Sequence, residues 1–146
     1  MLCLAVLMSA CSDEHASVMP DLAVVVPPFC VDAASPLAPT YDNVSRLFAM
    51  RCTTCHEGTD VDLSRDRAIA TLVRRAVPSY ESTDESCGGL LVVPGDAGVS
   101  YLAQKVTSAT PCAGAQMPRG EFASQALPMC EQRLIVDWIN AGSPGP

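Results

Sequence analysis

The chain has 146 residues and a formal charge of −7, from 9 Lys and Arg against 16 Asp and Glu. This length allows one domain with some sequence left over. The negative charge argues against nucleic acid and against electrostatic docking on an anionic membrane, because no basic stripe is present to meet phosphates. Eight cysteines are many for this length. They indicate disulfides made in an oxidising compartment, or ligation of a metal or cofactor.

The N-terminus reads as an export signal. Residues 2–8 form a short apolar run, and two small residues then precede Cys11. This order is typical of a bacterial lipoprotein signal, although Met1-Leu2 lacks the usual basic opening. It predicts cleavage of residues 1–10 and a lipid on Cys11. The run is too short to span a bilayer, so the protein is expected in the periplasm or cell envelope, held to a membrane through lipid only.

Residues 11–40 are rich in Pro, Ala, Ser and Asp. Such composition predicts an extended tether, with at most one short strand at residues 22–26. Cys30 is the residue of this stretch that could pin the tether to the folded part. We expect the domain itself to occupy residues 41–146.

Within the domain, apolar residues recur at helical spacing in several short stretches. The expected fold is all-α, with short helices joined by long loops. Asp42 or Asn43 is expected to cap the first helix. The expected elements, in order, are a helix to Arg51, an extended segment 61–64, a helix 65–76, an apolar segment 90–93, a helix 100–106, a loop 107–122, and a last helix from Pro128 to Gly142.

Residues 52–56 read Cys-Thr-Thr-Cys-His. On a helical turn this spacing brings both thiols and the imidazole to one side. Cys52 and Cys55 could then bond the two vinyl groups of a porphyrin while His56 stands under the iron. The motif therefore predicts one covalent haem c with His56 as an axial ligand. The alternatives are a zinc site that uses two later cysteines, or a redox dithiol, which would call for a βαβ setting.

Three methionines compete for the other side of the iron. Met50 is too close to the motif, and Met129 starts the last helix, where methionine more often packs in a core. Met117 lies in a loop next to Pro118. The proline restricts the backbone of this loop and has no N–H group that could compete as a hydrogen-bond donor. We therefore expect Met117 as the distal ligand, which suits a haem of raised potential. The alternatives are an open sixth position or ligation by His15, which is expected to be solvated in the tether.

The chain resembles the class I cytochromes c of exported bacterial proteins over residues 42–144. The resemblance implies a cytochrome c-like fold whose first and last helices cross near the haem edge, with Phe48 against Trp138. It also implies His56 and Met117 as axial ligands. The chain departs from the family at Val44 and Glu57, where Gly is frequent. The matching segments are Phe48, residues 52–56, residues 93–96 with 100–102, Met117-Pro118, and residues 137–142.

Four cysteines remain once Cys3 is assigned to the signal, Cys11 to lipid and two to haem. They allow three pairings. Loop positions favour Cys87 with Cys112, a bond that would brace the Met117 loop, and leave Cys30 with Cys130. The alternative is buried free thiols.

Together these features predict a single-haem electron carrier that serves redox partner proteins. No catalytic constellation accompanies the motif, so the chain is not expected to be an enzyme. Two other functions stay open: a haem-based sensor or enzyme module with an open sixth position, and a zinc or disulfide module without haem.

Overall fold

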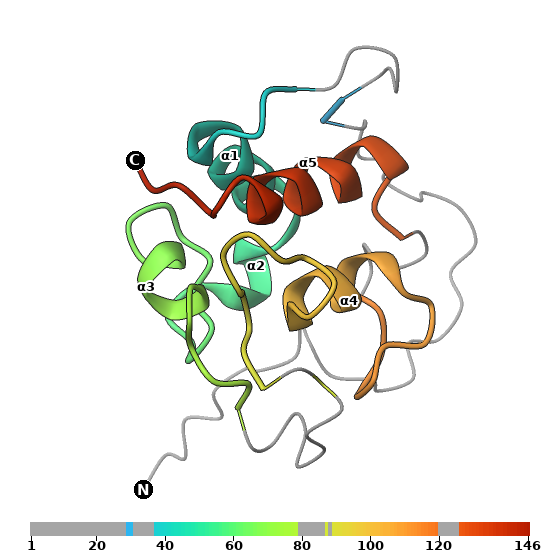
Figure 1. The fold of residues 1–146 in the computed structure, drawn as a ribbon. Helices are drawn as coiled ribbons and strands as arrows, with labels where there is room; N and C mark the ends of the chain where they lie inside the picture. The colour runs from blue at the N-terminus through green and yellow to red at the C-terminus, as the bar shows by residue number, and fades with distance from the viewer. Residues whose placement is uncertain (1–28, 31–36, 79–86, 88, 120–125) are drawn as a thin grey trace, which may run out of the picture.

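The computed structural model describes residues 29–30, 37–78, 87, 89–119 and 126–146. In these ranges the protein is helical and has no strand, only isolated bridges that join Val73 to Val92 and Ala76 to Leu90. The signal, Cys11, His15 and the strand expected at 22–26 lie outside the described residues. The helices are α1 (Tyr41–Arg51), α2 (Thr53–His56), α3 (Ala68–Leu72), α4 (Tyr101–Thr107) and α5 (Met129–Asn140) (Figure 1). None of these helices has the length and apolar character that crossing a bilayer requires.

The helix ends differ slightly from the prediction. Thr40, not Asp42 or Asn43, caps α1, because its side-chain oxygen accepts the Asn43 N–H at 3.4 Å. At the other end of the domain, Pro128 is the residue just before α5 rather than its first turn. Gly142 follows α5 with φ of 93°, a left-handed backbone that favours glycine at a helix end.

The helix predicted at 65–76 is much shorter in the structure. After α3, Val73 turns extended and Arg74 takes a positive φ of 56°. The backbone then pairs with the apolar segment 90–92: the Arg74 N–H donates to the Val92 carbonyl at 2.9 Å, and the Leu91 N–H donates to the Arg75 carbonyl at 2.7 Å. This tertiary pairing outweighs the weak helical preference of the local sequence.

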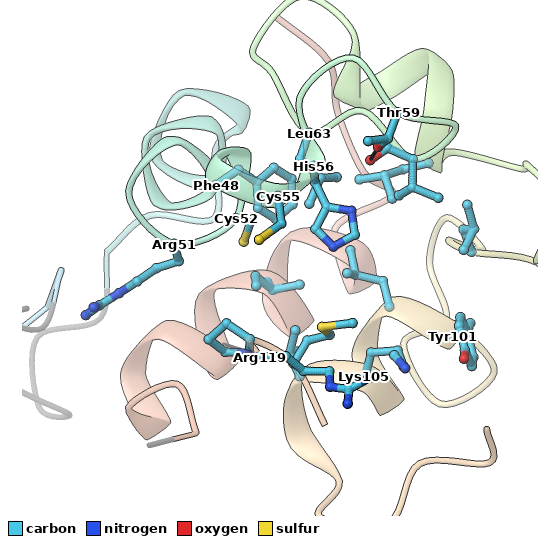
Figure 2. Close-up of a pocket in the computed structure, with 18 of the residues that line it drawn as sticks. Phe48, Arg51, Cys52, Cys55, His56, Thr59, Leu63, Tyr101, Lys105 and Arg119 are labelled. Atoms are coloured by element: carbon cyan, nitrogen blue, oxygen red, sulfur yellow. Dashed lines mark hydrogen bonds between the residues drawn. The ribbon is translucent and has the colours of Figure 1, made fainter. Parts of the chain in front are cut away.

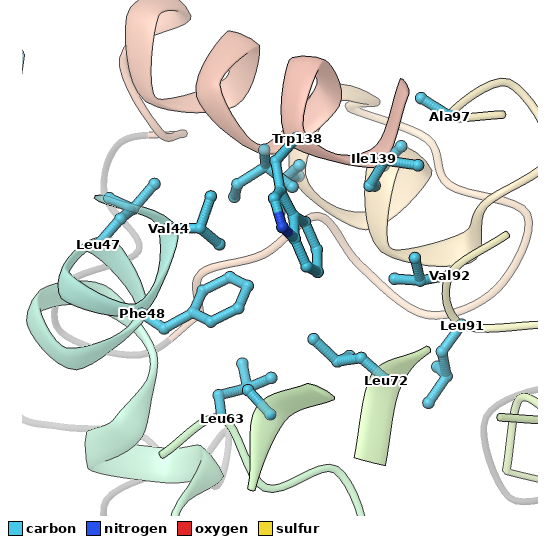
Figure 3. Close-up of a cluster of buried hydrophobic side chains, with 14 of the residues drawn as sticks. Val44, Leu47, Phe48, Leu63, Leu72, Leu91, Val92, Ala97, Trp138 and Ile139 are labelled. Carbon is cyan, nitrogen blue, oxygen red and sulfur yellow. The ribbon is translucent and has the colours of Figure 1, made fainter. Parts of the chain in front are cut away.

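The core lies where α5 crosses α1 (Figure 1). Val44, Phe48 and Trp138 are fully buried there, and Figure 3 shows the Phe48 and Trp138 side chains between the two helices. The Tyr41 ring stands 6.3 Å from the Trp138 ring. The indole N–H donates to the Pro144 carbonyl at 3.0 Å, so the polar edge of this buried ring is satisfied.

The segment before α4 is fastened to the end of α5. The Gly95 N–H donates to the Ile139 carbonyl at 2.8 Å, and the Ala97 N–H donates to the Asn140 side-chain oxygen at 3.0 Å. Ser100 closes the turn by donating its hydroxyl to the Asp96 carbonyl at 2.7 Å. These bonds place α4 against α5, and the two helices together form one wall of the cavity described next.

Candidate cofactor site

A cavity of about 370 Å³ opens between the cysteine motif and α4 (Figure 2). Its volume lies in the range of small-molecule and cofactor sites, roughly 300–1,000 Å³. Side chains of α1, α2, α3, α4 and α5 line it together with the loop that contains Met117. The apolar part of the wall consists of Phe48, Val61, Leu63, Leu72, Pro78, Leu91, Leu102, Val106 and Ile135.

The motif occupies the junction of α1 and α2. Cys52 ends α1 and starts the single turn of α2, and its carbonyl accepts the Cys55 N–H at 3.1 Å and the His56 N–H at 2.9 Å. Figure 2 shows the Cys52 and Cys55 sulfurs side by side and the His56 ring pointing into the cavity. All three residues line the cavity. The structure thus brings the motif together in the arrangement that its spacing predicts.

Met117 lines the same cavity, although it lies far from the motif in sequence. Its N–H donates to the Lys105 carbonyl at 2.7 Å, and the Gln116 side chain donates to the Val106 carbonyl at 3.1 Å. These two bonds attach the Met117 loop to the end of α4. The other candidates do not line the cavity: Met50 is 46% exposed and Met129 is 77% exposed. The expectation that Met129 packs in the core was wrong, because its side chain points to solvent at the start of α5.

Asp62 is not among the site residues predicted from the sequence, but it organises the chain after His56. Its carboxylate accepts the Ser64 N–H at 2.9 Å and the Gly58 N–H at 3.1 Å. The hydrogen bonds from Ser64 hold the pKa of Asp62 below its ordinary value. Burial acts in the opposite direction, and smaller effects of the Gly58 N–H and the Arg67 charge lower the pKa further. The Leu63 N–H donates to the His56 carbonyl at 2.7 Å, so the same turn fixes the imidazole-bearing residue. An Asp two residues before a Ser is the local signal that could have revealed it.

We expect Asp62→Asn to lower the free energy of unfolding at neutral pH. A depressed folded pKa stabilises the protein above the unfolded value of 3.8, and that stabilisation is lost as the pH falls through the folded pKa. The difference between wild type and variant should therefore shrink below pH 3.8. Urea titrations at a series of pH values measure it, with the exposed neighbour Asp60→Asn as control. A difference that stays constant into acid would contradict this role of the charge.

Three cations line the cavity besides the motif: Arg51, Lys105 and Arg119. Lys105 is buried, donates to the Ala113 carbonyl at 3.3 Å, and lies 5.5 Å from the Tyr101 ring centre. Figure 2 shows Lys105 and Arg119 on the side opposite His56. Periodicity within α4 gave no sign that a lysine would face inward. Positive charge beside apolar walls suits an amphiphilic ligand that carries anionic groups.

The two cysteines of the motif differ in state. Cys52 is a free thiol whose pKa is raised to about 12, by burial first and then by the Glu131 carboxylate, while Arg51 acts in the opposite direction. Cys55 is disulfide-bonded, and its partner lies outside the described residues.

The remaining cysteines form two disulfides, Cys30–Cys130 and Cys87–Cys112. This is the pairing that their positions in the sequence favour. All four sulfurs are therefore engaged and cannot serve as zinc ligands beside the motif. Among the residues that the structure describes, no cluster of three or more His, Cys, Asp or Glu side chains could hold a metal ion.

The Cys87–Cys112 bond should contribute substantially to stability. It closes a loop across a sequence separation of 25, which by chain entropy is worth about 3 kcal/mol. We expect the double variant Cys87→Ala, Cys112→Ala to lose about that much free energy of unfolding in urea titrations. Measuring both proteins again in reductant provides the control, because the difference should then largely vanish. An equal difference in reductant would assign the loss to packing of the buried Cys87 side chain.

Comparisons with protein-family models, with curated proteins and with solved structures find no match for this chain. The cavity and the residues that line it are therefore the basis for assigning a function.

Proposed function

We propose that the chain is a class I c-type cytochrome domain that holds one haem c and carries single electrons in the bacterial cell envelope. The observation that carries the proposal is that His56 and Met117, remote in sequence, line one cavity with Cys52 and Cys55. When bound, haem supplies one-electron chemistry between ferric and ferrous iron.

The composition of the cavity supports this ligand. A porphyrin presents a broad apolar ring and two carboxylates, and the cavity combines apolar walls with the cations Lys105 and Arg119. A cation near a carboxylate in a partly desolvated site forms a strong, charge-assisted hydrogen bond. The paired thiols of the motif lie on the opposite side of the cavity from Lys105 and Arg119 (Figure 2). Covalent attachment and carboxylate binding would thus use different parts of the wall.

The residues take distinct roles in this proposal. His56 would be the proximal ligand, held by the turn that Asp62 organises. Met117 would be the distal ligand, held by the bond from its own N–H to the Lys105 carbonyl. With both axial positions occupied, no substrate could reach the metal, which favours electron transfer over catalysis or gas sensing.

Attachment through Cys55 requires its sulfur as a thiol. The disulfide at Cys55 and a thioether at the same sulfur therefore exclude each other.

The setting in the cell is part of the proposal. A lipid on Cys11 would hold the protein to a membrane in the periplasm or cell envelope, and redox proteins would be its partners. The formal charge of −7 would steer it toward basic partner surfaces.

The test is a pyridine haemochrome assay combined with intact-mass measurement, on full-length chain made with the cytochrome c maturation machinery. We expect one haem per chain that survives denaturation. The ferric spectrum should show the weak red band of sulfur-to-iron charge transfer. Protein without haem, or with bound zinc, would overturn the proposal. Rapid binding of carbon monoxide by the ferrous form, with no red band, would replace the electron carrier with a module whose sixth position is open.

A further inference from the structure

A buried carboxylate lies beside the cysteine motif, outside the cavity. Glu131, in the first turn of α5, has no exposed surface. Its two oxygens bind the Arg51 guanidinium as a fork, at 2.7 Å and 3.0 Å. One of these oxygens also accepts the Phe29 N–H. The Arg51 side chain is only 11% exposed, so the whole ion pair is shielded from water.

A buried ion pair adds little net free energy of folding as a link between two helices. Removing two charges from water opposes their attraction, and an apolar pair of similar size often stabilises a protein as well or better. Arg51 lines the cavity and directly precedes Cys52, while its charged end turns away from His56 (Figure 2). The pair therefore places two opposite and nearly balanced charges behind the attachment motif.

The same carboxylate connects three cysteine-bearing segments. Phe29 precedes Cys30, Arg51 precedes Cys52, and Glu131 follows Cys130, to which Cys30 is disulfide-bonded. The Phe29 ring also lies 5.2 Å beneath the Arg46 guanidinium. Residues 29–30 are thus fastened to α1 and α5, whereas the sequence predicted an extended tether through residue 40. The described residues of the predicted tether therefore pack against the ion pair next to Cys52.

We propose that Glu131 is a positioning residue for the haem site: it anchors Arg51 and Phe29 behind Cys52, and its negative charge offsets that of Arg51 at the site. This inference rests on the proposed function, since it assigns a role in setting the reduction potential.

With haem attached, the midpoint potential should respond to each charge with opposite sign. Glu131→Gln leaves Arg51 uncompensated, which favours the ferrous form and raises the potential. Arg51→Gln should lower it. We expect at least about a threefold change in the reduction equilibrium in each case, which is ~28 mV for one electron. The double variant should return toward wild type, although it lacks the ion pair altogether. Asp137→Asn and Arg133→Gln, from the exposed pair on the same helix, are the matched controls.

These outcomes distinguish an effect of the Glu131 and Arg51 charges on the potential from a purely structural role of the ion pair. Shifts of the same sign in both single variants, or no shift beyond that of the controls, would overturn the proposal. If Glu131→Gln does not accumulate as folded protein, the midpoint potentials of Arg51→Gln and Arg51→Lys are compared instead. A lowered potential in the glutamine variant alone supports the role of charge, and equal potentials refute it.

A second measurement needs no haem and so distinguishes failure of this inference from failure of the proposed function. In full-length chain made without the maturation machinery, the rate at which iodoacetamide modifies Cys52 at fixed pH reports the local charge. Glu131→Gln should raise this rate and Arg51→Gln should lower it, because the thiolate is the reactive form. Rates that move together, or that follow the exposed controls, would count against the inference even if haem attaches as proposed.

Discussion

Replacing Cys52 and Cys55 together by serine should abolish covalent haem attachment. Both sulfurs line the cavity and lie side by side at the junction of α1 and α2 (Figure 2). A serine hydroxyl has nearly the same size, so the fold around the motif should persist while the thioether bonds cannot form. After expression with the maturation machinery and extraction with acidified acetone, the variant should retain no haem, whereas we expect wild type to keep one per chain.

The matched control is Thr54→Ala. Thr54 lies between the two cysteines and is exposed, so its removal alters the motif without touching a sulfur or the cavity wall. This variant should keep its covalent haem. Haem that resists extraction from the double serine variant would show that attachment occurs elsewhere. Loss of haem from Thr54→Ala would show that the assay reports recognition by the maturation machinery rather than the chemistry of the thiols.

The parts of the site that follow from short-range geometry could be predicted from the sequence. Cys52, Cys55 and His56 are separated by less than one and a half turns, so any helical turn puts them on one side. Met117 could be preferred to Met50 because a loop residue next to Pro118 can reach a part of the cavity wall that a residue close to the motif cannot, and the structure places Met117 on that wall. The all-helical class followed in the same way from the periodicity of apolar residues.

What could not be predicted depends on contacts between distant segments. The helix expected to run through Ala76 stops at Leu72, because the backbone beyond it pairs with residues 90–92. Glu131 reads in sequence as an ordinary acidic residue in a first helical turn. It is buried because the fold brings Arg51 and Phe29, which are distant in sequence, into contact with its carboxylate. Lys105 likewise faces inward because α4 packs beside α5, which no local pattern of the sequence reveals.

The core and the site share one wall. Phe48 and Ile135 are fully buried in the hydrophobic core, and both also line the cavity. A change that loosens the crossing of α1 and α5 should therefore alter the candidate site through these two side chains. Stability of the crossing and shape of the cavity should vary together.

Trp138→Ala should be the most destabilising single substitution in the domain. The indole is fully buried, stands beside the Tyr41 ring, and donates to the Pro144 carbonyl that fixes the C-terminal segment. Removing a buried ring of this size leaves a void that rigid neighbours fill only partly, at a cost of about 3–5 kcal/mol. We expect a loss of this size in the free energy of unfolding, measured by urea titration followed by far-UV circular dichroism.

Met129→Ala, on the same helix but 77% exposed, is the control and should change stability by roughly 0.5 kcal/mol or less. Equal effects of the two variants would mean that α5 does not bury Trp138 against α1. Trp138→Phe separates the two contributions of the indole, because it restores most of the ring volume without the hydrogen bond to Pro144. If volume at the crossing dominates, this variant should recover most of the loss. If the bond to the C-terminal segment dominates, it should remain close to Trp138→Ala, and the crossing of α1 and α5 would then depend on residues 141–146 as much as on its own packing.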